Sequence, residues 1–204
     1  MNYLAHAYLS FGDPDILIGN MIADMLRGKQ MDNFPYAIRK GVVIHRKIDR
    51  FTDEHPIVRH TKKIFNYSAR RYDGIFLDIA YDYFLANDTS RTPENGWMNF
   101  SQWCYSEVDK RISLLPERFI KMFEVMKQDN WLYNYKNEWM IKRSFSWISK
   151  RAIYLPNNAN IFADFTNGLQ NIQNSYNEFF PELEEFVKEE LRIISEVEND
   201  HRYY

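Results

Sequence analysis

The chain has very little cysteine. Cys104 is the single cysteine among 204 residues, so no disulfide can form within the chain and a cysteine-rich zinc site is excluded. A reducing compartment is the simplest expectation. No apolar run approaches the roughly 18 residues that a membrane span needs, and no signal-peptide pattern opens the sequence. We therefore expect a cytoplasmic protein without a membrane anchor.

Glycine and proline are also scarce, with seven of each. This scarcity disfavours a loop-rich sandwich or barrel and favours long helices joined by short turns. A hydrophobic content of 45% is enough for a sizeable core, and no segment has the composition of a linker. We predict an all-α fold, a compact helical bundle that forms a single domain over residues 1–204.

The charge is nearly balanced, with a formal net charge of −2. This balance gives no indication of a nucleic-acid partner or a membrane surface. The distribution is uneven, because basic residues outnumber acidic ones in residues 1–72, whereas glutamate dominates residues 182–200. Either an acidic partner docks on the N-terminal half, or the basic helix faces are merely solvated.

Helix signals recur along the chain. Asp13 and Pro14 have the pattern of a helix cap and first position, and they predict a helix that ends at Gly28 and carries a partly buried Asp24. Further helices are expected over residues 2–10, from Tyr36 to about residue 53, over 56–71 and over 75–88. Thr92 and Pro93 resemble another helix start.

The main chemical feature lies in GVVIHRKIDRFTDEHP, residues 41–56. Residues four apart on a helix lie above one another, so His45, Asp49 and Asp53 project from one face. An imidazole and two carboxylates suit Mn²⁺, Mg²⁺, Fe²⁺ or Zn²⁺. The alternative for such a pattern, taken alone, is a surface pair of histidine and aspartate.

Other helices carry side chains of the same kind. Asp78 and Asp82 form a second pair four residues apart in an aromatic helix, where buried carboxylates need arginines or a metal as partners. His6 and Asp24 each lie among apolar residues, where one alone is more often a hydrogen-bonded core residue. Convergence of all these side chains is typical of helical metallophosphohydrolases.

Familiar catalytic motifs of other classes are missing. The sequence has no glycine-rich phosphate loop, no G-x-S-x-G, no H-E-x-x-H and no C-x-x-C. Nucleotide-binding folds, serine hydrolases, zincins and thiol chemistry therefore lack support.

Four blocks in order carry a family resemblance: MNYLAHAYLS, GNMIADMLRGK, GVVIHRKIDRFTDEHP and LDIAYDYFLA. Together they resemble the acyl carrier protein phosphodiesterase family, which is similar to the all-helical, divalent-metal-dependent HD-domain phosphohydrolases. The resemblance implies hydrolysis of the phosphodiester that joins 4′-phosphopantetheine to a serine of holo acyl carrier protein. The chain departs from HD domains in one respect: no histidine is followed directly by aspartate, since Arg46 follows His45 and Pro56 follows His55.

The resemblance and the residue pattern together give a predicted site. We expect Asp24, His45 and Asp49 to be catalytic, with Mn²⁺ or Mg²⁺ as the cofactor and Asp53 as an outer group. The predicted metal ligands are His6, Asp24, His45, Asp49, Asp78 and Asp82. We expect Arg27, Arg46 and Arg50 to contact the substrate or carrier protein. The alternatives are a phosphohydrolase of nucleotides or another small phosphoester, and a non-catalytic helical module that binds an acidic protein.

Overall fold

The computed structural model describes residues 1–156 and 159–201, and over these residues the fold is helical without a β-strand. The α-helices are α1 (Tyr3–Tyr8), α2 (Pro14–Ile22), α3 (Tyr36–Glu54), α4 (Pro56–Thr61), α5 (Lys63–Ala69), α6 (Asp73–Asn87), α7 (Gly96–Asp109), α8 (Glu117–Gln128), α9 (Trp131–Asn134), α10 (Glu138–Ser149) and α11 (Ile161–His201). Short 3₁₀ helices are η1 (Ala23–Met25), η2 (Gly28–Asn33), η3 (Arg70–Tyr72), η4 (Thr89–Arg91) and η5 (Ile112–Leu114). The predicted all-α class is confirmed.

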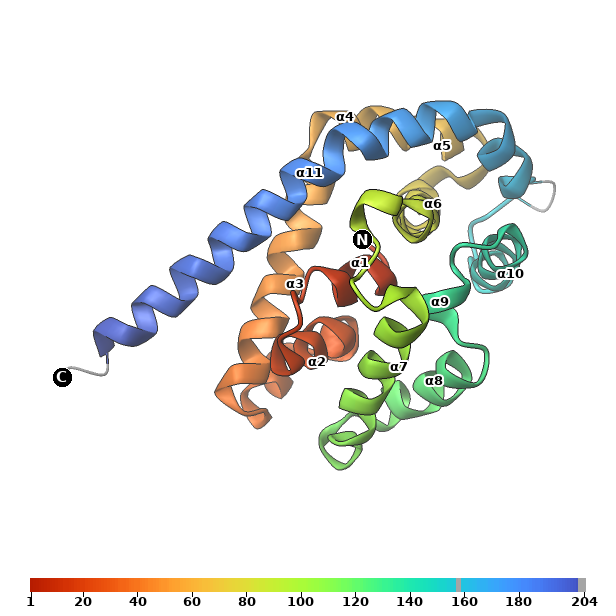
Figure 1. Cartoon of the computed structure of the whole chain (residues 1–204). Coiled ribbons are helices and arrows are strands. Elements are labelled where there is room, and N and C mark those ends of the chain that lie inside the picture. The colour runs from red at the N-terminus through yellow and green to blue at the C-terminus, as the bar shows by residue number, and fades with distance from the viewer. Residues whose placement is uncertain (157–158, 202–204) are drawn as a thin grey trace.

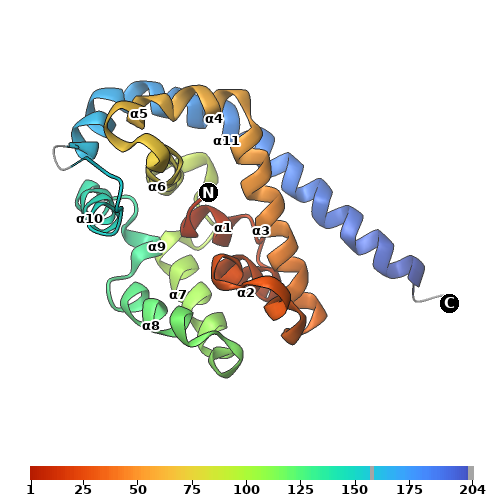
Figure 2. The same ribbon diagram turned by 180° about the vertical axis from the view of Figure 1, so that it is seen from behind.

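The short helix α1 lies in the middle of the molecule, where it contacts α2 and α6 (Figure 1). The long helix α11 passes along α4, α5 and α6 and then beside α3 toward the C-terminus. Helices α8, α9 and α10 lie on the opposite side from that end of α11, as both views show (Figure 2). No helix in the described residues is long and apolar enough to span a membrane.

Helices α2 and α3 pack directly on each other through two glycines. A Cβ atom on Gly19 would lie 2.3 Å from the carbonyl oxygen of Ile38 and 2.5 Å from the Cα of Gly41. A Cβ on Gly41 would lie 2.5 Å from the carbonyl oxygen of Ile16. Only glycine allows the two backbones to approach this closely. This contact fixes the distance between α2 and the central part of α3, which bears the predicted histidine and aspartate.

The predicted start of α2 is confirmed, but its predicted end is wrong. Pro14 is the first residue of α2, and the Asp13 carboxylate accepts hydrogen bonds from the backbone N–H groups of Asp15 and Ile16. The α-helix ends at Ile22 rather than at Gly28, because the chain tightens into η1 and then leaves it in an extended conformation. Helix ends of this kind frequently tighten into 3₁₀ geometry.

Two other predicted boundaries differ. The helix expected over 56–71 is divided at Lys62 into α4 and α5 and ends in η3. Helix α7 begins at Gly96 and not at Thr92 and Pro93, which lie in the preceding loop. The φ angle of Gly96 is +75°, a left-handed conformation that favours glycine and marks the turn into the helix.

Candidate metal centre

The site forms where α1, η1, α3 and α6 meet, and it is built around the middle of α3. His45 and Asp49 are one helical turn apart on α3, and His45 Nε2 lies 3.0 Å from Asp49 Oδ2. The predicted alignment of these two side chains on one helix face is confirmed. His45 is buried, whereas 37% of the Asp49 side chain is exposed. The pair therefore lies at the edge of the core with access from solvent.

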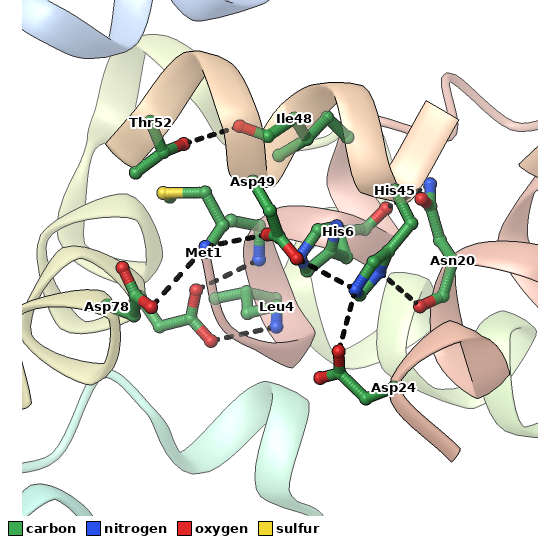
Figure 3. A network of polar contacts seen from close by, with 12 residues as sticks. Met1, Leu4, His6, Asn20, Asp24, His45, Ile48, Asp49, Thr52 and Asp78 are labelled. Carbon is green, nitrogen blue, oxygen red and sulfur yellow. Dashed lines mark hydrogen bonds and ion pairs between the residues drawn. The ribbon is translucent and has the colours of Figure 1, made fainter. Parts of the chain in front are cut away.

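A hydrogen bond to the backbone fixes the orientation of the His45 ring. Its Nδ1 lies 2.9 Å from the backbone carbonyl oxygen of Asn20, which can only accept a hydrogen bond. Nδ1 must therefore carry the proton, so the lone pair of the neutral ring is on Nε2. Histidines that bind metals usually donate their second N–H in this way. Nε2 faces the Asp24 and Asp49 carboxylates (Figure 3).

His6, from α1, stacks on His45. The ring centroids are 3.9 Å apart and the ring planes differ by 14°. His6 is buried and its Nε2 lies 3.2 Å from Asp49 Oδ1, yet the geometry forms no hydrogen bond. Within residues 1–156 and 159–201 neither ring nitrogen has a hydrogen-bond partner. Burial, followed by the neighbouring His45, lowers the pKa of His6 to about 4. The ring is therefore neutral and keeps a free lone pair.

Asp49 connects most of the groups in the site. Besides the two histidines, its Oδ1 accepts a hydrogen bond of 3.2 Å from the buried α-ammonium group of Met1. Burial disfavours its charge, but this ammonium group and the histidines hold the pKa of Asp49 well below its usual range. The Met1 ammonium also lies 3.5 Å from Asp78 Oδ2. Burial opposes its charge, but Asp78 and Asp49 raise its pKa to about 11.

The protonation of His45 depends on its two carboxylate partners. Burial favours its neutral form, but the hydrogen bonds to Asp24 and Asp49 raise the pKa of His45 to about 9. In the metal-free protein a proton on Nε2 thus lies between two carboxylates. A cation at this position would replace that proton, since both bind the same lone pair.

The donor atoms fit a divalent metal. One ligand atom each from His6, His45 and Asp49 lies within 4.8 Å of the others. Two neutral imidazoles and a carboxylate form a common ligand set for divalent transition metals. The unpartnered nitrogens of His6 supply the strongest evidence, because a buried polar atom without a partner is costly unless a ligand satisfies it. Three protein ligands would also leave positions open for water and substrate.

Asp24 contacts the cluster, but its side chain is exposed and not partly buried as predicted. Its Oδ1 lies 3.1 Å from His45 Nε2, while 70% of its side chain is exposed. The apolar neighbours of Asp24 in the sequence face the core, whereas the 3₁₀ turn of η1 directs the carboxylate outward. The hydrogen bond with His45 lowers the pKa of Asp24, so the carboxylate stays ionised at the mouth of the site.

The two carboxylates of α6 have other partners. Asp82 is completely buried, and its two oxygens accept hydrogen bonds from the backbone N–H groups of Leu4 (2.8 Å) and Ala5 (3.0 Å). It thus caps the N-terminus of α1, the helix that carries His6. Asp78 pairs with the Met1 ammonium. We therefore do not retain Asp78 and Asp82 in the proposed ligand set, although both were predicted as ligands.

The remaining predicted residues lie on the surface. Asp53 is exposed one turn beyond Asp49, and it forms no side-chain ion pair within the described part of the chain. Arg27, Arg46 and Arg50 are also exposed, and no ion pair within residues 1–156 and 159–201 involves their side chains. Their role in substrate contact stays a prediction.

Two groups that shape the site were not predicted from the sequence. One is the backbone carbonyl of Asn20, which fixes the ring of His45; a backbone atom leaves no signal in the sequence. The Asn20 side chain also donates hydrogen bonds to the carbonyl oxygen of His6 (3.0 Å) and to Ser10 Oγ (2.9 Å). A buried asparagine in an otherwise apolar helix was the available signal. The other is the Met1 ammonium, which no residue pattern indicates.

Comparison with known proteins decides the family. The model of the family described as acyl carrier protein phosphodiesterase matches residues 1–183. This chain belongs to that family. The predicted resemblance is thereby confirmed, and every predicted site residue lies within the matched region.

Curated members of the acyl carrier protein phosphodiesterase family align with most of the chain. The protein of that name from Serratia proteamaculans is 29% identical over 190 residues, which cover 93% of this chain and 98% of the relative. That from Escherichia coli O6:H1 is 28% identical over 186 residues (91% and 96%), and that from Salmonella agona is 30% identical over 152 residues (74% and 79%). No solved structure matches the chain, and the likeness to HD domains stays a prediction.

Proposed function

We propose that this chain is a metal-dependent phosphodiesterase that releases 4′-phosphopantetheine from holo acyl carrier protein and leaves the apo protein. The observation that carries the proposal is the convergence of His6, His45 and Asp49 around a space suited to a divalent cation. The printed name of the family and of its curated relatives supports the choice of substrate.

His6, His45 and Asp49 would hold the metal, and we propose Mn²⁺ or Mg²⁺. Mn²⁺ accepts imidazole nitrogen more readily than Mg²⁺, which prefers oxygen ligands and keeps several waters. When bound, such a cation supplies Lewis acidity, which activates a water and neutralises charge on a phosphoryl oxygen.

The chain's own groups would orient the reaction. In the net reaction, a water oxygen forms a bond to phosphorus, the bond from phosphorus to the serine oxygen breaks, and that oxygen gains a proton. Asp24 is exposed and ionised next to His45, so its Oδ1 can accept a hydrogen bond from the attacking water. The carbonyl of Asn20 keeps Nε2 of His45 directed into the site throughout.

The protein substrate would approach from the exposed side of the site. Acyl carrier proteins are small and acidic, and Arg27, Arg46 and Arg50 supply exposed positive charge near the N-terminal half. Such charges accelerate encounter more than they add final affinity, and salt weakens their effect. We propose that the chain acts on this substrate in the cytoplasm. The scarcity of cysteine supports this location.

The test is to incubate holo acyl carrier protein with the purified chain and Mn²⁺ and to follow the carrier protein by intact-mass spectrometry. We expect loss of the mass of 4′-phosphopantetheine, abolished by EDTA and by His45→Ala. His60→Ala is the matched control, because His60 is an exposed histidine on α4 that is not part of the cluster. An unchanged carrier protein, or phosphate release from a nucleotide panel in its place, would overturn the proposal.

A further inference from the structure

A cavity with mainly apolar walls is lined by side chains of α8, α9 and α10 and by Met25 of η1. It has a volume of about 310 Å³, at the lower end of the roughly 300–1,000 Å³ common for small-molecule sites. Its lining includes Met25, Met122, Val125, Trp131 and Trp147. Met25 directly follows Asp24 in η1, so this end of the cavity lies on the same short helix as the Asp24 carboxylate.

A second cavity of about 120 Å³ adjoins the first. The two share Val125, Trp131 and Trp147, and the second also reaches Tyr3 of α1 and Ile79 of α6. We call the two cavities together the arm groove. Its walls include aromatic rings and thioethers, which adapt to a slender, mainly apolar chain.

Tyr3 connects the arm groove with the metal centre. Its hydroxyl donates a hydrogen bond of 3.2 Å to Met122 Sδ on α8, and Tyr3 lies three residues before His6 on α1. Burial and the carboxylate of Asp24 raise the pKa of Tyr3, while Arg118 opposes that shift. The Tyr3 hydroxyl is therefore close enough to both charged groups to be influenced by them.

The rim of the arm groove is positively charged. Arg118, Lys121 and Arg151 line the first cavity and Arg143 lines the second. Arg118 is exposed and has no ion-pair partner within the described residues, whereas Lys121 pairs with Glu117 and Arg143 with Asp129. The rim thus offers an available guanidinium group beside Tyr3, where an anionic group of a ligand could be bound.

One polar group within the arm groove has no partner. The indole N–H of Trp131, which borders both cavities, is buried and has no hydrogen-bond partner among the residues that the structure describes. An unpaired buried donor is costly unless a ligand accepts from it. A ligand with amide carbonyl groups would satisfy this donor while its apolar segments pack on Met122 and Trp147.

We propose that the arm groove binds the pantetheine arm of the substrate, with the phosphate at the Asp24 and Arg118 end and the amides beside Trp131. The inference rests on the proposed function and adds the binding site that selects this prosthetic group. A pantetheine arm has the required chemistry: an anionic phosphate end, a branched apolar segment and two amides. An acidic protein surface has the charge but could not enter a groove of this volume.

The test fills the groove without touching the metal centre. Val125 lines both cavities and is 41% exposed on α8, so Val125→Trp narrows the groove while leaving the core intact. Glu124→Trp is the matched control, because Glu124 is the exposed neighbour of Val125 and lines neither cavity. The measurements are KM and kcat for holo acyl carrier protein, hydrolysis of bis(p-nitrophenyl) phosphate, Mn²⁺ affinity, and quenching of tryptophan fluorescence by free 4′-phosphopantetheine.

We expect Val125→Trp to raise KM for the holo protein by roughly tenfold or more. Affinity for free 4′-phosphopantetheine should fall to the same extent, whereas Mn²⁺ affinity and hydrolysis of the small diester should stay unchanged. Wild-type kinetics with Val125→Trp would overturn the arm groove while the proposed function stands. Equal losses in both tryptophan variants would indicate that a protein surface docks here and would also overturn it. A wild-type chain that releases no prosthetic group overturns both proposals together.

Discussion

The imidazole rings of His6 and His45 stack at a centroid distance of 3.9 Å although 38 positions in the sequence separate them, and both direct Nε2 toward the carboxylate of Asp49. Two protonated imidazoles could not share this space, because like charges at such a distance repel strongly. Burial and then His45 lower the pKa of His6, whereas the hydrogen bonds to Asp24 and Asp49 raise the pKa of His45, so only His45 carries the additional proton of an imidazolium. A divalent cation is the ligand that allows both rings to be neutral and both lone pairs to be used.

Asp49→Asn should abolish tight metal binding. The amide keeps the shape of the side chain but removes the charge that the two histidines share, so we expect Mn²⁺ affinity to fall by roughly a hundredfold or more. Asp53→Asn is the matched control, one turn further along α3 and exposed, and it should bind Mn²⁺ like the wild type. Titration calorimetry with both variants measures the difference, and circular dichroism checks the fold. Equal affinities in the two variants would contradict the proposed ligand set.

Metal binding should release about one proton near neutral pH. In the metal-free protein His45 has a pKa of about 9 and is protonated, His6 has a pKa of about 4 and is neutral, and Asp49 is ionised. The metal must therefore displace the proton of His45 alone. The apparent affinity should rise about tenfold for each pH unit up to about pH 9 and then level off.

The proton count can be measured directly by calorimetry in buffers with different enthalpies of ionisation. The slope of observed enthalpy against buffer enthalpy gives the number of protons released. A value of zero at pH 7 would show that His45 is already neutral, and a value of two would show that His6 is protonated as well. Either value contradicts the charge distribution described here.

The sequence predicted one part of the site reliably and another part poorly, for a physical reason. The spacing of His45 and Asp49 fixes their relative position, because a helix places residues four apart on one face. The same spacing does not indicate how far along α3 the helix face is buried. Asp53 lies beyond the buried part of α3. Convergence with His6 depends on the packing of α1, which no local pattern encodes.

The carboxylates show the same limit. The apolar surroundings of Asp24 and Asp82 looked alike in the sequence, yet Asp24 is 70% exposed and Asp82 is completely buried. The difference arises because α2 ends at Ile22, and Asp24 lies on the turn that follows. Asp82 is in the middle of α6 and faces the first N–H groups of α1. Burial of a carboxylate follows from helix ends and tertiary packing, which are the least predictable features of a sequence.

Gly41→Ala should destabilise the protein strongly. The new Cβ would lie 2.5 Å from the carbonyl oxygen of Ile16 and 2.8 Å from the Cα of Gly19, and both are backbone atoms that cannot change rotamer. We expect the free energy of unfolding to fall by about 1–3 kcal/mol or more. Urea unfolding monitored by circular dichroism measures this change. Gly74→Ala is the control, with nothing within 4 Å of the added Cβ, and it should be neutral or stabilising by up to about 1 kcal/mol. A fully stable Gly41→Ala variant would show that α2 and α3 are further apart.

Two aspartates that each cap a helix should respond differently to replacement by asparagine, because Asp13 accepts both hydrogen bonds on Oδ1 whereas Asp82 uses both of its oxygens. Asp13 and Asp82 each accept two backbone hydrogen bonds at 2.8 and 3.0 Å, but Asp13 is exposed at the start of its own helix whereas Asp82 is buried and reaches α1 from α6. Asparagine caps helices about as well as aspartate. We therefore expect Asp13→Asn to change the free energy of unfolding by only about a few tenths of a kcal/mol.

In Asp82→Asn the two N–H donors of Leu4 and Ala5 meet one carbonyl oxygen and one amide group. The amide group cannot accept, so one buried donor loses its partner at a cost of roughly 1–3 kcal/mol. Because α1 carries His6, the displaced helix terminus should also weaken Mn²⁺ binding in Asp82→Asn but not in Asp13→Asn. Urea unfolding and calorimetry of both variants test the two effects together. Loss of stability with unchanged metal affinity would mean that α1 keeps His6 in place without its cap, and the proposed dependence of the metal centre on Asp82 would be wrong.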